Sequence, residues 1–159
     1  MNMTNQIMKK IKNSKTYSCP VTKVPIGIYK QLYSLNFGGD WDLRPTLVTC
    51  RKYGCYEEGD RTEAWVHYIL DMRTGIVLGW SLTFEWKRAH WAYFYVRKQA
   101  RRSGIGRRLV LRASRHNFEK HGENTHIRSY SPETRNFFEQ GKQFLKSRKL
   151  PWEIVMHYR

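Results

Sequence analysis

The sequence predicts an α/β domain in which helices flank a single mixed sheet. Residues 62–96 contain three consecutive strand patterns, and a tight turn at Gly75 joins the first two. Beyond them, two helical patterns are each followed by a short strand pattern. The chain has 159 residues, of which 40% are hydrophobic, and this suffices for one core. The expected order is helix, strand, hairpin, strand, helix, strand, helix, strand around one sheet.

The first third of the chain predicts one helix and one short strand. We expect residues 1–20 to be a mobile basic segment that precedes a single domain over residues 21–159. Apolar residues recur at helical spacing from Ile28 to Leu35, with Pro25 near the start of this pattern and two glycines just past its end. The sequence TLVTCRKY, at residues 46–53, predicts a short strand.

The middle of the chain carries the clearest local pattern. Residues 62–72 and 76–86 predict two strands of a hairpin, with Gly75 in the turn. Both faces of the first strand are largely apolar, which is typical of a strand inside a sheet. Residues 90–96, HWAYFYV, predict a third strand that is aromatic over most of its length.

The last third of the chain predicts two helices, each followed by a strand. The first helix begins near Gly104, runs to about Lys120 and is stopped by Gly122. A short strand is expected at residues 125–130. The second helix covers residues 131–149, with Ser131 as N-cap and a proline in its first turn. Residues 152–158 close the domain as a strand.

The formal net charge is +16, and the two ends of the chain carry it. Residues 1–39 contain six lysines and no acidic residue, and residues 97–159 contain sixteen basic and five acidic residues. The stretch between them is nearly neutral. Such a surplus predicts an anionic partner, which could be nucleic acid, an anionic cofactor or an acidic protein. The alternative is that the charge serves solubility alone.

Other classes of protein are disfavoured. No apolar run is long enough to cross a membrane, and the N-terminus lacks the apolar centre of a secretory signal. The odd set Cys19, Cys50 and Cys55 has neither zinc-finger spacing nor a second Cys/His pair. We therefore expect no membrane, no metal site and free thiols in a reducing cytoplasm. The oligomeric state stays open.

The stretch RKQARRSGIGRRLVLRASRHNFEKHG, from Arg97 to Gly122, combines two glycines with many cations. A strand ends at Val96, and a helix starts at Gly104. Amides at a helix start are unpaired and carry partial positive charge, so small residues there let a phosphate approach. The stretch matches neither a Walker loop nor the full dinucleotide glycine pattern. It predicts a phosphate-binding loop, the alternative being an ordinary tight connection.

The segment RRSGIG resembles the R/Q-x-x-G-x-G/A signature of the GCN5-related N-acetyltransferases (GNAT family). The hairpin with Gly79, the strand that ends at Val96 and the helix that follows extend this resemblance over about residues 62–140. The resemblance implies that the loop binds the pyrophosphate of acetyl-CoA and that the end of the preceding strand pairs with the pantetheine arm. The implied loop residues are Arg101, Arg102, Ser103, Gly104, Ile105 and Gly106, and the implied strand-end residues are Tyr95, Val96 and Arg97.

A general base must take a proton from the acceptor amine. Some members of the family use a glutamate eleven residues before the first residue of the signature, and that offset falls on His90. An imidazole suits a base at neutral pH. The alternatives are Glu85 as the base, or a purely structural histidine at a strand start.

The position of the general acid departs from the family. Members that protonate the departing thiolate commonly use the tyrosine of a Phe-Tyr pair, and the matching residue here is Phe138. Tyr130 is a candidate substitute and equally a candidate packing residue. Ser131 matches the small polar residue that precedes the pair in the family. The resemblance implies that Ser131 and Phe138 lie against the coenzyme.

Two functions follow. The first is an acetyl-CoA-dependent N-acetyltransferase that acts on an amine, with tRNA, DNA or a ribonucleoprotein as the acceptor. The second is a non-catalytic module with the same fold that binds nucleic acid or an acidic protein. Basic residues far along the chain from the loop suit a phosphate-rich partner. These are Lys9, Lys10, Lys12, Lys15, Lys146, Arg148 and Lys149.

Overall fold

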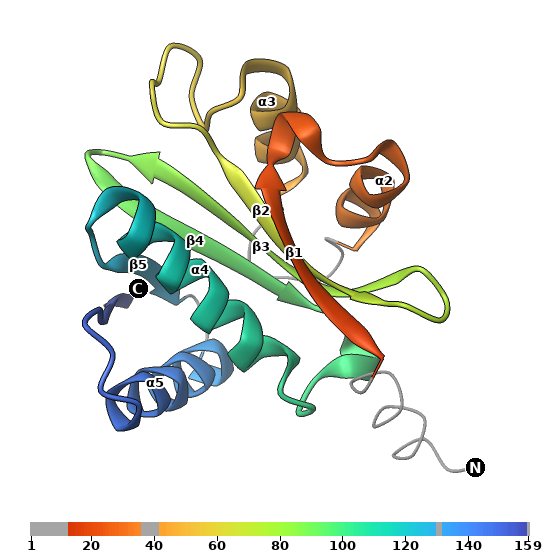
Figure 1. The fold of residues 1–159 in the computed structure, drawn as a ribbon. Helices are drawn as coiled ribbons and strands as arrows, with labels where there is room; N and C mark the ends of the chain where they lie inside the picture. Colours follow the sequence, from red (N-terminus) through yellow and green to blue (C-terminus); the bar gives the residue numbers. More distant parts are fainter. Residues whose placement is uncertain (1–12, 36–41, 130–131, 159) are drawn as a thin grey trace.

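The computed structural model describes residues 13–35, 42–129 and 132–158. They form one six-stranded sheet whose strand order follows the chain, β1-β2-β3-β4-β5-β6 (Figure 1). The pairs from β1 to β4 are antiparallel, while β4–β5 and β5–β6 are parallel. The strands are β1 (Ser14–Pro20), β2 (Trp65–Asp71), β3 (Ile76–Trp86), β4 (Ala89–Val96), β5 (Thr125–Ser129) and β6 (Ile154–Tyr158). The single mixed sheet predicted from the sequence is confirmed.

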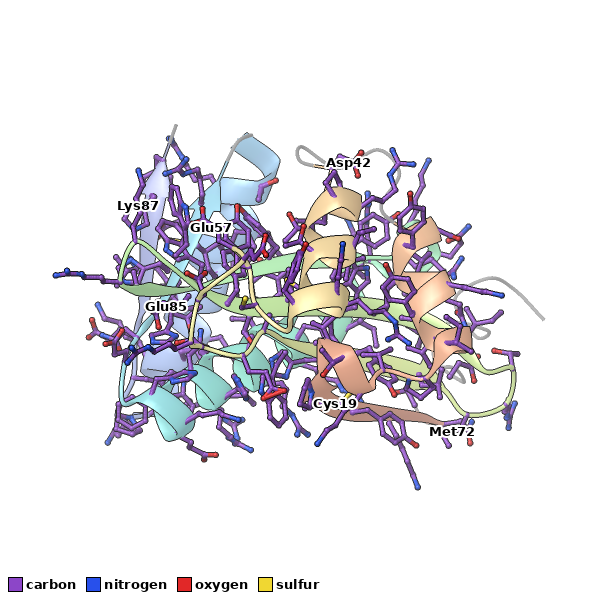
Figure 2. All side chains as sticks on the ribbon, turned by 90° about the horizontal axis from the view of Figure 1, so that it is seen from above. Cys19, Asp42, Glu57, Met72, Glu85 and Lys87 are labelled. Atoms are coloured by element: carbon purple, nitrogen blue, oxygen red, sulfur yellow. The ribbon has the colours of Figure 1, made fainter. Side chains whose placement is uncertain are left out.

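Helices cover both faces of the sheet (Figures 1 and 2). The helices α2 (Ile26–Ser34) and α3 (Arg44–Tyr53) pack on the face that carries Trp80, Leu82 and Phe84 of β3. The helices α4 (Ile105–His121) and α5 (Pro132–Ser147) pack on the opposite face. Short 3-10 turns, η1 (Val21–Lys23) and η2 (Lys98–Ala100), follow β1 and β4. Trp80 is fully buried on the α2/α3 side, and Ile127 is buried against α5.

The expected strand over residues 46–53 is wrong, because these residues form most of α3. Pro45 lies in the first turn of α3, and Gly54 ends it with a left-handed φ of 80°. Leu47 and Cys50 are buried, which is a helical spacing on one face. The β-branched residues of this segment suggested a strand, but the proline and glycine at its two ends favour a helix.

The expectation that order begins at residue 21 is also wrong. Ser14–Pro20 forms the edge strand β1, whose register runs from Ser14 opposite Asp71 to Pro20 opposite Trp65. Small hydroxyl residues alternate with Tyr17 and Cys19 in this strand, and β2 supplies the partner that makes the pattern a strand. Lys9, Lys10 and Lys12 lie outside the described residues.

The remaining elements match their predictions in type and nearly in bounds. The hairpin turns at Gly75, where φ is 70°, and α4 ends at Gly122, where φ is 69°. Both glycines hold a conformation that other residues adopt at a cost. The three cysteines are free thiols. In the described ranges no helix is long and apolar enough to cross a membrane, and no cluster of potential metal ligands occurs.

Candidate active site

Strands β4 and β5 separate after their first two paired residues. His90 lies opposite Thr125, and Trp91 lies opposite His126. β4 continues to Val96 without further pairing to β5 in the described part of the chain. β5 stays paired with β6 over its whole length. The sheet therefore opens between β4 and β5, toward the end of β4 that leads into α4.

The end of β4 presents backbone polar groups to this opening. The amide of Arg97 donates to the carbonyl of Leu78 on β3 over 2.8 Å. Because successive residues of a strand direct their polar groups to opposite sides, those of Val96 face the opening and those of Tyr95 face β3. By the same alternation the groups of Phe94 face the opening, so the pair suited to an inserted chain is Val96 with Phe94. Phe94 was missed by the sequence analysis, whose three strand-end residues were consecutive.

The connection from β4 to α4 ends in an uncapped helix start. Arg102 and Gly104 have left-handed backbone, with φ of 61° and 89°. The first helical bond runs from the amide of Arg108 to the carbonyl of Gly104 over 3.1 Å, and no side chain caps the helix. The amides of residues 105–107 therefore lack helical acceptors, and the helix dipole adds partial positive charge there. This geometry binds anions.

The side chains around this helix start are cationic. Exposed basic residues here are Lys98, Arg101, Arg102 and Arg107. The sequence contains no acidic residue between Glu85 and Glu119. Nε of Arg101 donates to the carbonyl of Val96 over 3.0 Å, and the hydroxyl of Ser103 donates to the carbonyl of Ala100. These two bonds hold the loop against the end of β4.

Gly79 on β3 fixes how closely α4 approaches the sheet. A Cβ atom at this position would lie 3.0 Å from both Cδ1 of Leu109 and the carbonyl oxygen of Tyr95, and 3.1 Å from Cγ2 of Ile105. Ile105 and Leu109 are fully buried on this face. The missing side chain therefore lets the first turn of α4 sit directly on β3, where its amides point past the end of β4.

The ring of Phe137 occupies the space that a side chain at Gly106 would need. A Cβ atom here would lie 2.5 Å from Cζ and 2.8 Å from Cε2 of Phe137 on α5. At Gly104, in contrast, no protein atom lies within 4 Å of such a Cβ, so the space there is open. Of the two glycines, Gly104 is the one that leaves room for a phosphate. Gly106 leaves room for the ring of Phe137.

Phe138 is a buried residue of α5 that contacts the end of β4. It is 5% exposed, and its ring centroid lies 5.3 Å from that of Phe94. A phenol at this position would be buried among apolar side chains. Tyr130 and Ser131 lie outside the described residues, and their predicted roles stay predictions.

His90 lies one residue before the point at which β4 and β5 part, and it is 6% exposed. Its Nε2 lies 3.9 Å from Oε2 of Glu85 and 3.6 Å from Oε2 of Glu123. Its ring stacks on that of His121 with 3.9 Å between centroids. Its Nδ1 is buried without a hydrogen-bond partner among the described residues. The arrangement places an imidazole beside two carboxylates where the β4–β5 opening begins.

The structure brings together the two base candidates and adds two neighbours. Glu85 lies directly opposite His90 across the β3–β4 pair, and its carboxylate accepts a hydrogen bond from Thr62. Figure 2 shows Glu85 at the same end of the molecule as Glu57 and Lys87. Glu123 and His121 come from the end of α4, about thirty residues away in sequence. No local pattern links them to His90, so sequence reasoning missed them.

Burial lowers the pKa of several histidines on this side of the sheet. It brings the pKa of His116 to about 4, with Lys120, His121 and His90 acting in the same direction. It also lowers the pKa of His121, which His90 and Lys120 lower further while Glu85 and Glu123 oppose the shift. These rings are therefore neutral at pH 7.

The basic residues assigned to nucleic acid do not form one patch in the described structure. Lys15 is exposed on β1 and points away from the face that carries Ser14 and Thr16. Lys146, Arg148 and Lys149 are exposed at the end of α5. Lys15 and the cations at the end of α5 therefore lie in different parts of the described structure.

The opening between the parallel strands β4 and β5 lies next to an uncapped cationic helix start. The groups present fit coenzyme A, since Gly104 leaves space for the pyrophosphate and Val96 faces the opening. A family model described as acetyltransferase (GNAT) family matches residues 30–141, and the chain belongs to that family. Members of the family generally use acetyl-CoA.

Solved structures share this fold. An acetyltransferase from Trypanosoma brucei is 14% identical, covers 80% of this chain and 89% of its own, and has a TM-score of 0.53. Glucosamine-6-phosphate N-acetyltransferase from Arabidopsis thaliana is 16% identical, with the same coverages and a TM-score of 0.52. At these identities the likeness establishes the fold alone. A comparison with curated proteins returned no match.

Proposed function

We propose that this protein transfers an acetyl group from acetyl-CoA to an amine. The observation that carries the proposal is the joint placement of the β4–β5 opening and the α4 start. The backbone groups of Val96 face an opening that begins next to His90, and the helix start that binds anions follows within the same connection. One extended molecule with a phosphate at one end fits both parts.

Acetyl-CoA supplies the acetyl group as a thioester. The amides of residues 105–107 bind the pyrophosphate, and the cations of the loop offset its charge. Val96 and Phe94 align the pantetheine arm along β4. His90 accepts the proton of the acceptor ammonium, so that a neutral nitrogen attacks the thioester carbonyl. The C–S bond then breaks, the acylated nitrogen releases its second proton to water, and the thiolate takes a proton from water.

The chain's own charges support an acceptor that carries phosphates, such as tRNA, DNA or a ribonucleoprotein. One coenzyme accounts for the cations around Gly104, but not for the lysines at the N-terminus or for those at the end of α5. Glu85 remains the second candidate for the base, because its carboxylate lies within 4 Å of His90.

A second function is favoured by Phe137 and Phe138. Phe137 fills the space at Gly106, and Phe138 is buried where the family commonly has a tyrosine. Both features suit a module that keeps the fold and binds its partner without catalysis.

Gly104→Asp is the first test. The left-handed backbone at Gly104 is tolerated by both Asp and Asn, and neither side chain would meet a protein atom at its Cβ. The carboxylate would face the pyrophosphate, so we expect acetyl-CoA to bind at least about tenfold more weakly to Gly104→Asp than to Gly104→Asn, a difference of about 1.4 kcal/mol. Calorimetric titration measures both affinities. Equal affinities would show that the coenzyme does not bind at this loop.

A further inference from the structure

Four residues of α4 form a line of basic and titratable side chains on one side of the helix. They are Arg108, Arg112, His116 and Lys120, which we call the α4 row. Residues spaced by four lie on the same helical face. At a rise of 1.5 Å per residue, the α4 row extends over about 18 Å.

Contacts place the α4 row beside the first two strands. The guanidinium of Arg108 donates to Oγ of Ser14 over 2.6 Å and to Oγ1 of Thr16 over 3.0 Å, so the row begins against β1. At its other end, Nζ of Lys120 lies 4.0 Å from the ring centroid of Trp65 on β2.

Between these ends the cations act on one another. Arg112 and burial both lower the pKa of Arg108. Arg112 also contributes to the low pKa of His67, which lies beneath the row on β2. Lys120 likewise lowers the pKa of His116. Arg108 and Arg112 are therefore close enough to repel each other, whereas the ring of His116 is neutral at pH 7.

No carboxylate compensates this repulsion among the described residues. The ion pairs found there join Arg44 to Asp42, and His90 to Glu85 and Glu123, and none includes the α4 row. The only acidic residue of α4 is Glu119, which is exposed. Arg108 and Arg112 are like charges four residues apart, a spacing that is unfavourable in a helix. Arg108 is explained by its bonds to β1, but Arg112 and Lys120 have no ion-pair partner among the described residues.

We propose that the α4 row binds the phosphate backbone of a nucleic acid. The row carries three cations, Arg108, Arg112 and Lys120, over about 18 Å, a length that spans roughly five phosphates of one duplex strand. This site rests on the proposed function in that it gives the phosphate-rich acceptor a defined place on the protein.

The test compares two double variants of equal charge. Arg112→Gln with Lys120→Gln removes two cations of the row and leaves Arg108 in place to hold β1. Lys30→Gln with Lys52→Gln removes two exposed lysines from α2 and α3, on the other face of the sheet. Fluorescence anisotropy with labelled duplex DNA, single-stranded DNA and tRNA, between about 50 and 200 mM salt, gives the dependence of affinity on salt.

For the row variant we expect the slope of log affinity against log salt to flatten by roughly 1.8 with duplex DNA, from two lost phosphate contacts. The control variant should keep the wild-type slope. The three probes identify which nucleic acid binds best. The single variant Arg112→Gln, with an expected change of roughly 0.9, serves if the double variant does not fold.

Equal slopes for the two double variants would overturn the proposal, because the effect would then be one of net charge. Failure of all three probes to bind wild type at low salt, or binding of an acidic protein in their place, would overturn it as well. Calorimetry with acetyl-CoA separates this result from the proposed function. The row variant should bind acetyl-CoA as wild type does. If the wild-type protein fails to bind acetyl-CoA, the proposed acetyltransferase function is contradicted, but the proposal for the α4 row is not.

Discussion

Gly104 and Gly106 belong to one signature and are required for different physical reasons. Gly104 has a left-handed φ of 89° and open space in front of it. Gly106 has ordinary helical backbone, and the ring of Phe137 occupies the place of its side chain. A signature therefore identifies the loop, but the neighbours decide what each glycine does.

His90 is the residue whose replacement best tests the chemistry. We expect His90→Ala to lower turnover by on the order of a hundredfold or more, because the acceptor ammonium loses its proton acceptor. Acetyl-CoA affinity should stay close to that of wild type, since the loop and Val96 are unchanged. Steady-state kinetics across pH 6 to 9, with calorimetry on the same samples, gives both quantities.

The control for this prediction is Glu85→Gln, which removes the neighbouring carboxylate and keeps the hydrogen-bonding shape. If Glu85 is the base, this variant and not His90→Ala should lose the rate. His90→Gln fills the buried site that alanine would leave empty. If His90→Gln keeps the rate that His90→Ala loses, the role of His90 is packing. Equal rates for wild type and His90→Ala would remove His90 from the mechanism.

At the scale of elements, the packing of α4 on β3 fixes the position of the loop that we propose to bind the coenzyme. We expect Gly79→Ala to destabilise the protein by roughly 1–3 kcal/mol, because the added methyl group would press on Leu109, Ile105 and the backbone of Tyr95. The same displacement moves the helix start, so acetyl-CoA should bind more weakly. Urea denaturation measures the first effect, and calorimetry measures the second.

Gly141→Ala is the matched control. A Cβ atom at this position on α5 would lie 3.7 Å from Cγ1 of Val110, an ordinary contact, and alanine favours a helix over glycine. This variant should be neutral or up to about 1 kcal/mol more stable. Destabilisation of both variants by the same amount would mean that Gly79 has no special role in seating α4.

At the scale of the whole molecule, its histidines make stability depend on pH. The pKa values of His67, His116, His121 and His126 are all lowered in the folded state, chiefly by burial. Below a pH of about 6.5 the unfolded chain therefore binds more protons than the folded one. The free energy of unfolding therefore decreases as the pH is lowered. The thermal midpoint should drop between pH 7 and about 5, above the range in which most carboxylates titrate.

His116→Gln isolates one contribution. The pKa of His116 lies near 4, so the part of the loss that it causes should vanish in this variant, and the midpoint should change less over the same pH interval. Calorimetric scans at fixed ionic strength provide the midpoints. An identical pH dependence in wild type and variant would show that the protonation of His116 does not oppose folding.

Local patterns were sufficient for most of the fold. The hairpin, β4, α4 and the elements after it are set by periodicity and by glycines such as Gly75 and Gly122, which act within a few residues. The strand end, the cations and the helix start of the β4–α4 connection were also predictable, because they are contiguous in sequence, and phosphate binding there stays a prediction. The prediction is wrong for α3, where the β-branched residues of the segment favour a strand locally, whereas Pro45 and Gly54 at its two ends favour the helix that forms.

Tertiary structure alone decided the rest. β1 is a strand because β2 offers it a partner, and Arg108 holds it from a helix more than ninety residues away. Glu123 and His121 become neighbours of His90 only when the end of α4 packs against β4. The amino-acid sequence determined which groups of the chain are available for chemistry. Packing determined which of them meet, because contacts between distant segments depend on the docking of whole elements and leave no periodic trace in the sequence.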